Sequence, residues 1–160
     1  KIMTIKNFLY GLSCFLFTLI IGAGVYEHIA IWPHAFAAIP ASLGMFQGEY
    51  GVESAPFWMN IHPLTLLVFF ITLFTSWKTA RKKHVLFALV GYVVVLIVTF
   101  TYFVPELFKL IETPFSTEVN EQLTRRGTLW ENLSLVRAGF MLIVAAYLYA
   151  GAFKSGEKIH

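Results

Sequence analysis

Four apolar runs, each long enough to cross a lipid bilayer, constrain this 160-residue chain more than any other feature. A membrane-spanning helix needs about 20 residues that are mostly apolar. The runs predict helices over 7–31, 58–78, 84–111 and 128–153. In hydrocarbon a helix satisfies its own backbone hydrogen bonds within one segment. We therefore predict a single membrane domain over residues 1–160, an all-α, up-down-up-down transmembrane four-helix bundle.

The composition also favours a membrane location. Hydrophobic residues make up 58% of the chain, above the share in an average soluble domain. The formal net charge of +3 is small and gives no indication of nucleic-acid binding. Cys14 is the single cysteine, so no disulfide can form within one chain. The basic start before the first run would also suit a signal peptide, but we interpret the run as the first helix.

Prolines and aromatic residues mark the ends of the predicted helices. The segment 32–57 contains Pro33, Pro40 and Pro56, which predict a long loop with short helical pieces at the membrane surface. Pro63 fits the first turn of the second helix, and Pro105 is expected to kink or fray the end of the third. Several aromatic residues suit the belts that line membrane interfaces, namely Trp32, Phe46, Tyr50, Phe57 and Trp58.

Charged residues divide between the two ends of the predicted bundle. One end holds most of the basic residues, namely Lys1, Lys6, Lys78, Arg81, Lys82, Lys83, Lys154 and Lys158. The positive-inside rule predicts that this end, with both termini, is cytoplasmic. The other end, with the long loop and nearly all acidic residues, would face the periplasm or the cell exterior. We assign no role to His84 or His160.

Polar side chains recur where all four predicted helices reach the outer end. They are Glu27 and His28; Asn60 and His62; Tyr102, Glu106 and Lys109; and Arg126, Trp130, Glu131 and Arg137. Residues three, four or seven apart share a helix face, so the third and fourth groups each form a stripe. A charge inside a membrane helix is costly and indicates a functional site. We expect these side chains to converge on one pocket, with His62 facing inward.

Imidazoles together with carboxylates are typical ligands of Fe, Mn, Zn or Cu. The candidate metal ligands are His28, His62, Glu106, Glu131 and Glu27. The Glu-x-x-His motif of di-iron bundles does not occur, so the identity of the metal stays open. In the alternative interpretation, the carboxylates only form ion pairs with the basic residues, and the histidines only form hydrogen bonds at the interface.

The remaining polar residues of the outer end suit substrate binding. Arg126 and Arg137 could hold a phenolate or orient the carboxylates, because guanidinium pairs with both. Tyr102 is a candidate proton donor, and we list these three residues as catalytic candidates. Trp130 and Asn60 are candidate cofactor-binding residues. As alternatives, Trp130 is a belt residue and Tyr102 only packs on its neighbours.

Three parts of the chain resemble the anthrone oxygenase-like family of small four-helix membrane proteins. They are Gly22-Ala23-Gly24-Val25-Tyr26 running on to Pro33, Val104-Pro105-Glu106, and Arg126 to Arg137 with Trp130 between them. The resemblance implies the four-helix fold, a site at this end and oxidation of a phenolic substrate by oxygen. Where the family often has an asparagine after the proline and a histidine three residues before the last arginine, this chain has Glu106 or Leu107 at the first place and Ser134 at the second.

The main prediction is therefore a membrane oxidoreductase that acts on a small apolar or phenolic substrate reaching a metal-binding pocket from the bilayer lipid. One alternative is electron transfer through a haem ligated by His28 and His62. Another is a non-catalytic binding or assembly protein whose polar residues lock the bundle. The sequence leaves open whether the chain forms a homo-oligomer.

Overall fold

The computed structural model describes residues 4–154, and within that range it is helical without a β-strand. Four helices are long and apolar enough to cross a membrane: Ile5–Ala35, Ala55–Thr75, Lys82–Ile111 and Glu121–Phe153. The predicted all-helical fold with four such helices is confirmed. The predictions for Lys1, Lys158 and His160 lie outside the described residues.

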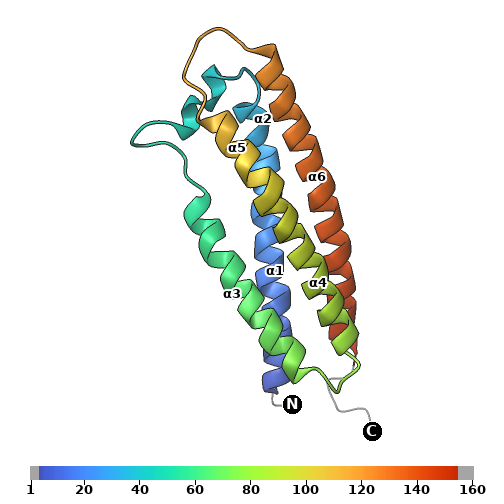
Figure 1. Ribbon diagram of the computed structural model, residues 1–160. Coiled ribbons are helices and arrows are strands. Elements are labelled where there is room, and N and C mark those ends of the chain that lie inside the picture. Colours follow the sequence, from blue (N-terminus) through green and yellow to red (C-terminus); the bar gives the residue numbers. More distant parts are fainter. Residues whose placement is uncertain (1–3, 155–160) are drawn as a thin grey trace.

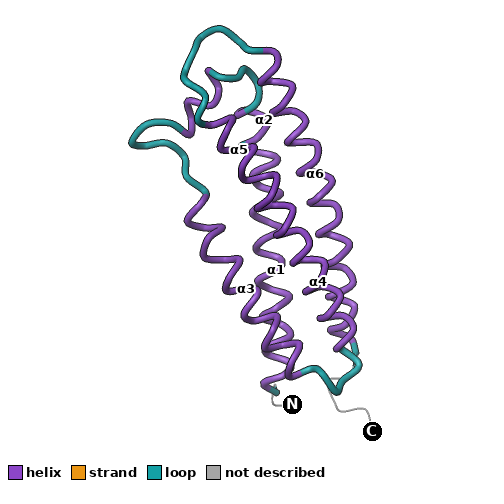
Figure 2. The backbone as a smooth tube through the Cα atoms, in the orientation of Figure 1, coloured by secondary structure: helices purple, strands orange, loops and turns teal. Residues whose placement is uncertain are grey.

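Short elements connect and extend the four long helices. In chain order the elements are α1 (Ile5–Ala30), α2 (Trp32–Ala35), η1 (Ala41–Phe46), α3 (Ala55–Thr75), α4 (Lys82–Val98), the π-helical η2 (Thr99–Phe103), α5 (Val104–Ile111), α6 (Glu121–Ala150) and η3 (Gly151–Phe153). Consecutive long helices run in alternate directions, so α1 begins and α6 ends at the same end of the bundle (Figure 1). We call this the termini end. The opposite end, where the loops before α3 and before α6 lie (Figure 2), is the loop end.

The outer surface of the bundle is apolar along its length. Ile29 is 74% exposed, Phe74 84% and Val136 71%, and each lies on a different long helix. Inside, Phe17 packs edge-to-face against Phe69 and Tyr92, joining α1, α3 and α4. Since a soluble protein rarely exposes such extensive apolar surface, this distribution suits a bundle that is surrounded by lipid.

Two helices begin earlier than predicted, for different reasons. Helix α3 begins at Ala55 rather than 58, and Pro56 occupies its first turn. Pro63 consequently lies inside the helix rather than at its start. Helix α6 begins at Glu121 rather than 128, because the Asn120 side chain accepts hydrogen bonds from the first free N–H groups. Its first turns are polar, so a search for apolar runs misses them.

Pro105 neither ends nor frays its helix. The chain passes from α4 through the π-helical η2 into α5, which continues to Ile111. The Val104 N–H donates to the Thr99 carbonyl, five residues back. Proline has no N–H, and its ring crowds the carbonyl four residues earlier. The wider π turn directly before Pro105 accommodates that ring without breaking the helix.

The basic turn at the termini end holds a buried arginine that the sequence interpretation missed. Arg81 is only 8% exposed. Its three nitrogens donate to the Asn7 Oδ1 at 2.7 Å, the Lys154 carbonyl at 3.0 Å and the Ala152 carbonyl at 3.2 Å. Arg81 therefore ties the α3–α4 turn to the start of α1 and to the end of α6.

The loop end packs closely on α6 at Gly127, and substitution there should reveal the contact. A Cβ at Gly127 would lie 2.8 Å from Ile39 Cδ1 and 2.9 Å from the Phe36 ring. We expect Gly127→Ala to lower the free energy of unfolding by about 1–3 kcal/mol through overpacking. Gly139 is the matched control on the same helix, with nothing within 4 Å, and Gly139→Ala should be neutral or stabilising. Thermal unfolding in detergent measures both, and equal effects would contradict the close contact.

Candidate functional site

A chain of four side chains connects α1, α3 and α4 in the half of the bundle towards the loop end. The Trp58 Nε1 donates to the Glu27 Oε1 at 3.0 Å. The Trp58 indole stacks on the His62 ring, with centroids 5.3 Å apart and an interplanar angle of 20°. The His62 Nδ1 lies 2.6 Å from the Tyr92 hydroxyl. We call Glu27, Trp58, His62 and Tyr92 the His62 group.

Helix periodicity explains how the His62 group forms. Trp58 and His62 are four residues apart on α3, so their rings lie on one face. Tyr92 is fully buried on α4 and reaches the imidazole from the neighbouring helix. Glu27 is half-buried and lies near the end of α1. His62 therefore points into the bundle, whereas Asn60 is exposed and its amide donates to the Pro56 carbonyl of its own helix.

Arg137 contributes from the fourth long helix. Its Nη1 donates to the Thr99 Oγ1 at 2.9 Å, and its Nη2 donates to the Ser134 Oγ at 2.8 Å. The guanidinium carbon lies 4.2 Å from the centroid of the Phe103 ring. No ion pair to Arg137 occurs within residues 4–154. In that part of the chain its guanidinium donates only to two neutral hydroxyls.

Arg137 lies deep in the apolar part of the bundle. At 1.5 Å per residue it is roughly 20 Å along α6 from Ala150, where the helix ends. The hydrocarbon core of a bilayer is about 30 Å thick. A charge at such a depth is costly unless polar groups surround it, and it indicates a functional role.

Glu106 and Arg126 form a separate pair at the loop end. The Arg126 Nε and Nη2 lie 2.8 and 2.7 Å from the same Glu106 oxygen. The two side chains are only 19% and 39% exposed, respectively. The ion-pair interpretation of Glu106 therefore describes its contact in the structure, and Arg126 is directed to this carboxylate rather than to the His62 group.

Trp32 and Trp130 lie inside the loop end rather than in a lipid-facing belt. Each is 3% exposed, and their rings meet edge-to-face at 4.8 Å. Phe36 and Phe103 cover Trp130 from other sides, and its Nε1 donates to the Phe103 carbonyl at 2.8 Å. The belt interpretation is wrong for these two residues because Trp32 on α2 and the following Phe36 pack against Trp130 on α6, which buries both indoles.

The other predicted site residues do not join these groups. The His28 Nδ1 lies 2.7 Å from the Gly24 carbonyl of its own helix. Tyr102 is 36% exposed and its one aromatic contact within the described residues is with Phe103. Glu131 and Lys109 make no side-chain hydrogen bond or ion pair in the described part of the chain. Among residues 4–154 no three His, Cys, Asp or Glu side chains gather as a metal site.

Four contributing residues were missed by the sequence interpretation, namely Trp58 as a site residue, Tyr92, Thr99 and Ser134. Their spacing could have pointed to them. Tyr92 and Thr99 are seven residues apart on one face of the third long helix, and Ser134 precedes Arg137 by three. A hydroxyl on the same face as a buried arginine is a candidate partner for it.

The fold and the placement of these polar side chains define a helical bundle of the membrane-protein class with an internal polar site. Comparison with protein-family models, curated proteins and solved structures gives no match. The anthrone oxygenase-like resemblance accordingly stays a prediction based on the three motifs in the sequence.

A double-mutant cycle should measure the coupling between Glu106 and Arg126. We expect Glu106→Gln and Arg126→Gln to couple by about 1 kcal/mol, discounted for partial exposure. Glu121 and Arg125 are the matched control, because their contact is 3.8 Å long and both side chains are mostly exposed. That pair should couple by at most a few tenths of a kcal/mol. Unfolding midpoints of the purified variants give both values, and absent coupling for the first pair would contradict the ion pair.

Proposed function

We propose that the chain is an integral membrane oxidoreductase that binds a small apolar, phenolic substrate between Arg137 and the His62 group. The substrate would reach this site from the bilayer. Following the charge bias, both termini are cytoplasmic, and the loop end faces the periplasm or the cell exterior. The long segment between α1 and α3 is then extracytoplasmic.

The bonding of Arg137 carries the proposal. A guanidinium has five N–H donors in a planar fork, and the two hydroxyl contacts of Arg137 use two of them. Oxyanions are its preferred partners, because charge-assisted hydrogen bonds are about twice as strong as neutral ones. A phenolate oxygen beside Arg137 would give this half-buried cation an anionic partner, and the aromatic ring of the substrate would suit the surrounding apolar side chains.

The His62 group supplies the proton chemistry in this proposal. An imidazole can act as a general base, so His62 is the side chain that would accept the proton of the phenol. The contact between Nδ1 and the Tyr92 hydroxyl orients the imidazole ring. In this proposal the other ring nitrogen, Nε2, accepts the proton of the substrate. Loss of the proton makes an aromatic ring richer in electrons and easier to oxidise. The oxidation itself is supported by the resemblance to the anthrone oxygenase-like family.

The described residues do not fit the predicted metal set. Glu106 is bonded to Arg126, His28 is held by its own helix, and Glu27 is bonded to Trp58. We therefore derive no step through a metal. Elemental analysis of the purified protein tests for one, and a Soret absorption band would identify the haem-based alternative.

Binding of a simple phenol should depend on Arg137. We expect Arg137→Gln to weaken the binding of 2-naphthol at least tenfold, about 1.4 kcal/mol, because the oxygen loses its cationic partner. His62→Gln should instead slow oxygen consumption with a smaller change in binding. Arg125→Gln is the matched control, since Arg125 is exposed on the same helix. Equilibrium dialysis in detergent measures the binding, and circular dichroism checks that each variant folds.

Naphthalene separates site binding from simple partition into the detergent. It has the same rings without the hydroxyl, so it should bind weakly and equally to the wild type and to Arg137→Gln. If naphthalene and 2-naphthol bind alike, or if Arg125→Gln weakens binding as much as Arg137→Gln, the phenol site is refuted.

A non-catalytic locking role is the second candidate, and the cross-helix bonds favour it. Arg137 joins α6 to Thr99 at the end of α4, and Trp58 joins α3 to Glu27. Polar contacts between membrane helices contribute about 0.6 kcal/mol each on average. A locking role predicts that Arg137→Gln lowers stability while the wild type binds no phenol.

A further inference from the structure

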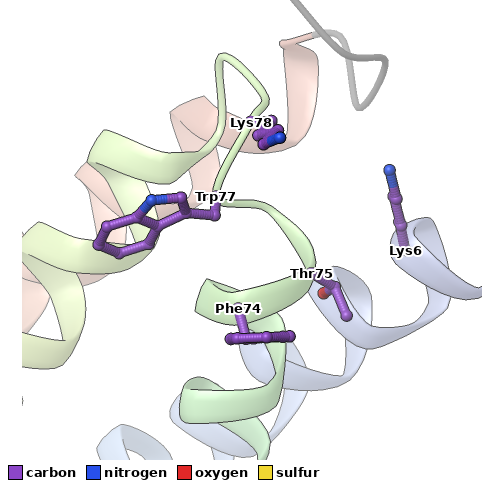
Figure 3. A pocket seen from close by; sticks show the side chains of 5 residues that line it. All are labelled: Lys6, Phe74, Thr75, Trp77 and Lys78. Atoms are coloured by element: carbon purple, nitrogen blue, oxygen red, sulfur yellow. The ribbon is translucent and has the colours of Figure 1, made fainter.

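The termini end of the bundle has an open groove that the proposed function does not use. Its lining comes from the start of α1, the end of α3 and the following turn: Lys6, Phe74, Thr75, Trp77 and Lys78. Figure 3 shows Lys6 on α1 and Lys78 on the turn, on either side of the end of α3. Two amines from separate elements therefore flank one hollow in the surface.

The groove is positively charged. Among residues 4–154 no carboxylate lines it, and neither Lys6 nor Lys78 forms an ion pair there. A third amine, the Lys82 Nζ, lies 3.6 Å from the centroid of the Trp77 ring. Because like charges repel unless an anion lies between them, this arrangement favours an anionic ligand.

An apolar stripe continues from the groove along α3. Phe74 lines the groove and is 84% exposed, and Phe70 and Leu67 follow it at 56% and 58%. These residues are spaced by four and three, so they share one outward face of the helix. Free phosphate would make no use of this stripe, whereas an acyl chain would cover it.

We propose that this groove binds the phosphate of an anionic phospholipid, with one acyl chain lying along Phe74, Phe70 and Leu67. Lys6 and Lys78 lie where apolar helices begin and end, which is the level of lipid headgroups in a bilayer. Basic pockets between membrane helices recognise anionic headgroups by this combination of charge and position. The proposal does not depend on the reaction at Arg137.

Native mass spectrometry of the full chain with phosphatidylglycerol and phosphatidylcholine tests the proposal. Wild type should retain phosphatidylglycerol in preference to phosphatidylcholine. The double variant Lys6→Gln/Lys78→Gln should bind phosphatidylglycerol at least fivefold more weakly. The matched control is Lys83→Gln/Lys109→Gln, which removes the same charge at residues that are exposed and do not line the groove. That control should bind as the wild type does.

Two further measurements distinguish binding of a phospholipid from binding of free phosphate. Phe74→Ala should weaken phosphatidylglycerol binding, and inorganic phosphate at millimolar concentration should not displace the lipid. Equal binding of the two lipids by the wild type would overturn the proposal, even if the double variant failed to fold. Equal losses in the double variant and its control, or displacement by inorganic phosphate, would overturn it as well.

Discussion

The half-buried Arg137 cation on an apolar helix is the constraint on which the loop half of the bundle depends. A charge on an apolar helix must find polar partners on neighbouring helices. Arg137 finds Thr99 across the α4–α6 contact, and the Phe103 ring lies under its guanidinium. The two helices can approach because Gly91 has no side chain: a Cβ there would lie 3.0 Å from Val144 Cγ2. The close approach at Gly91, which lies nearer the termini end, thus supports the contact between Arg137 and Thr99.

The π-helical segment links this charge to the loop end. Thr99 at its start accepts from Arg137, and Phe103 at its end accepts from the Trp130 indole through its carbonyl. Both partners come from α6, so one distorted turn holds two consecutive parts of that helix. The distortion lies directly before Pro105. A proline that the sequence alone associates with a frayed helix end therefore shapes the polar core, and π turns often occur at functional sites.

The sequence predicts the four helices because apolar length is a local property of each run. Starts such as Glu121 are missed because polar caps, not apolar residues, set them. Part of the polar cluster follows from the sequence, since Glu27 and His62 both contact Trp58, whereas Arg137 is bonded to Thr99 and Ser134. Partner choice was not predictable. Whether Glu106 meets Arg126 or a metal depends on helix rotation, and one helical residue turns a side chain by about 100°. Trp32 was wrongly predicted to face lipid. It is covered by Phe36 and Phe46 from the segment that follows it, and such contacts leave no periodic pattern in the sequence.

Two arginines in different parts of the bundle allow a direct comparison of roles: Arg81 is 8% exposed, and Arg137 is half-buried. Arg81 fastens the termini end, and its Nε, Nη1 and Nη2 each donate to an oxygen of the protein. Where the role is structural, each guanidinium nitrogen of Arg81 has an oxygen partner. Arg137 lies farther from the end of the bundle than Arg81 does. Within residues 4–154 only its two Nη atoms donate hydrogen bonds, and both acceptors are neutral hydroxyls. A purely structural arginine at that depth would gain more from a carboxylate or from carbonyl groups. In the function proposed above, the Arg137 donors that the described residues leave unused would bind a substrate oxygen.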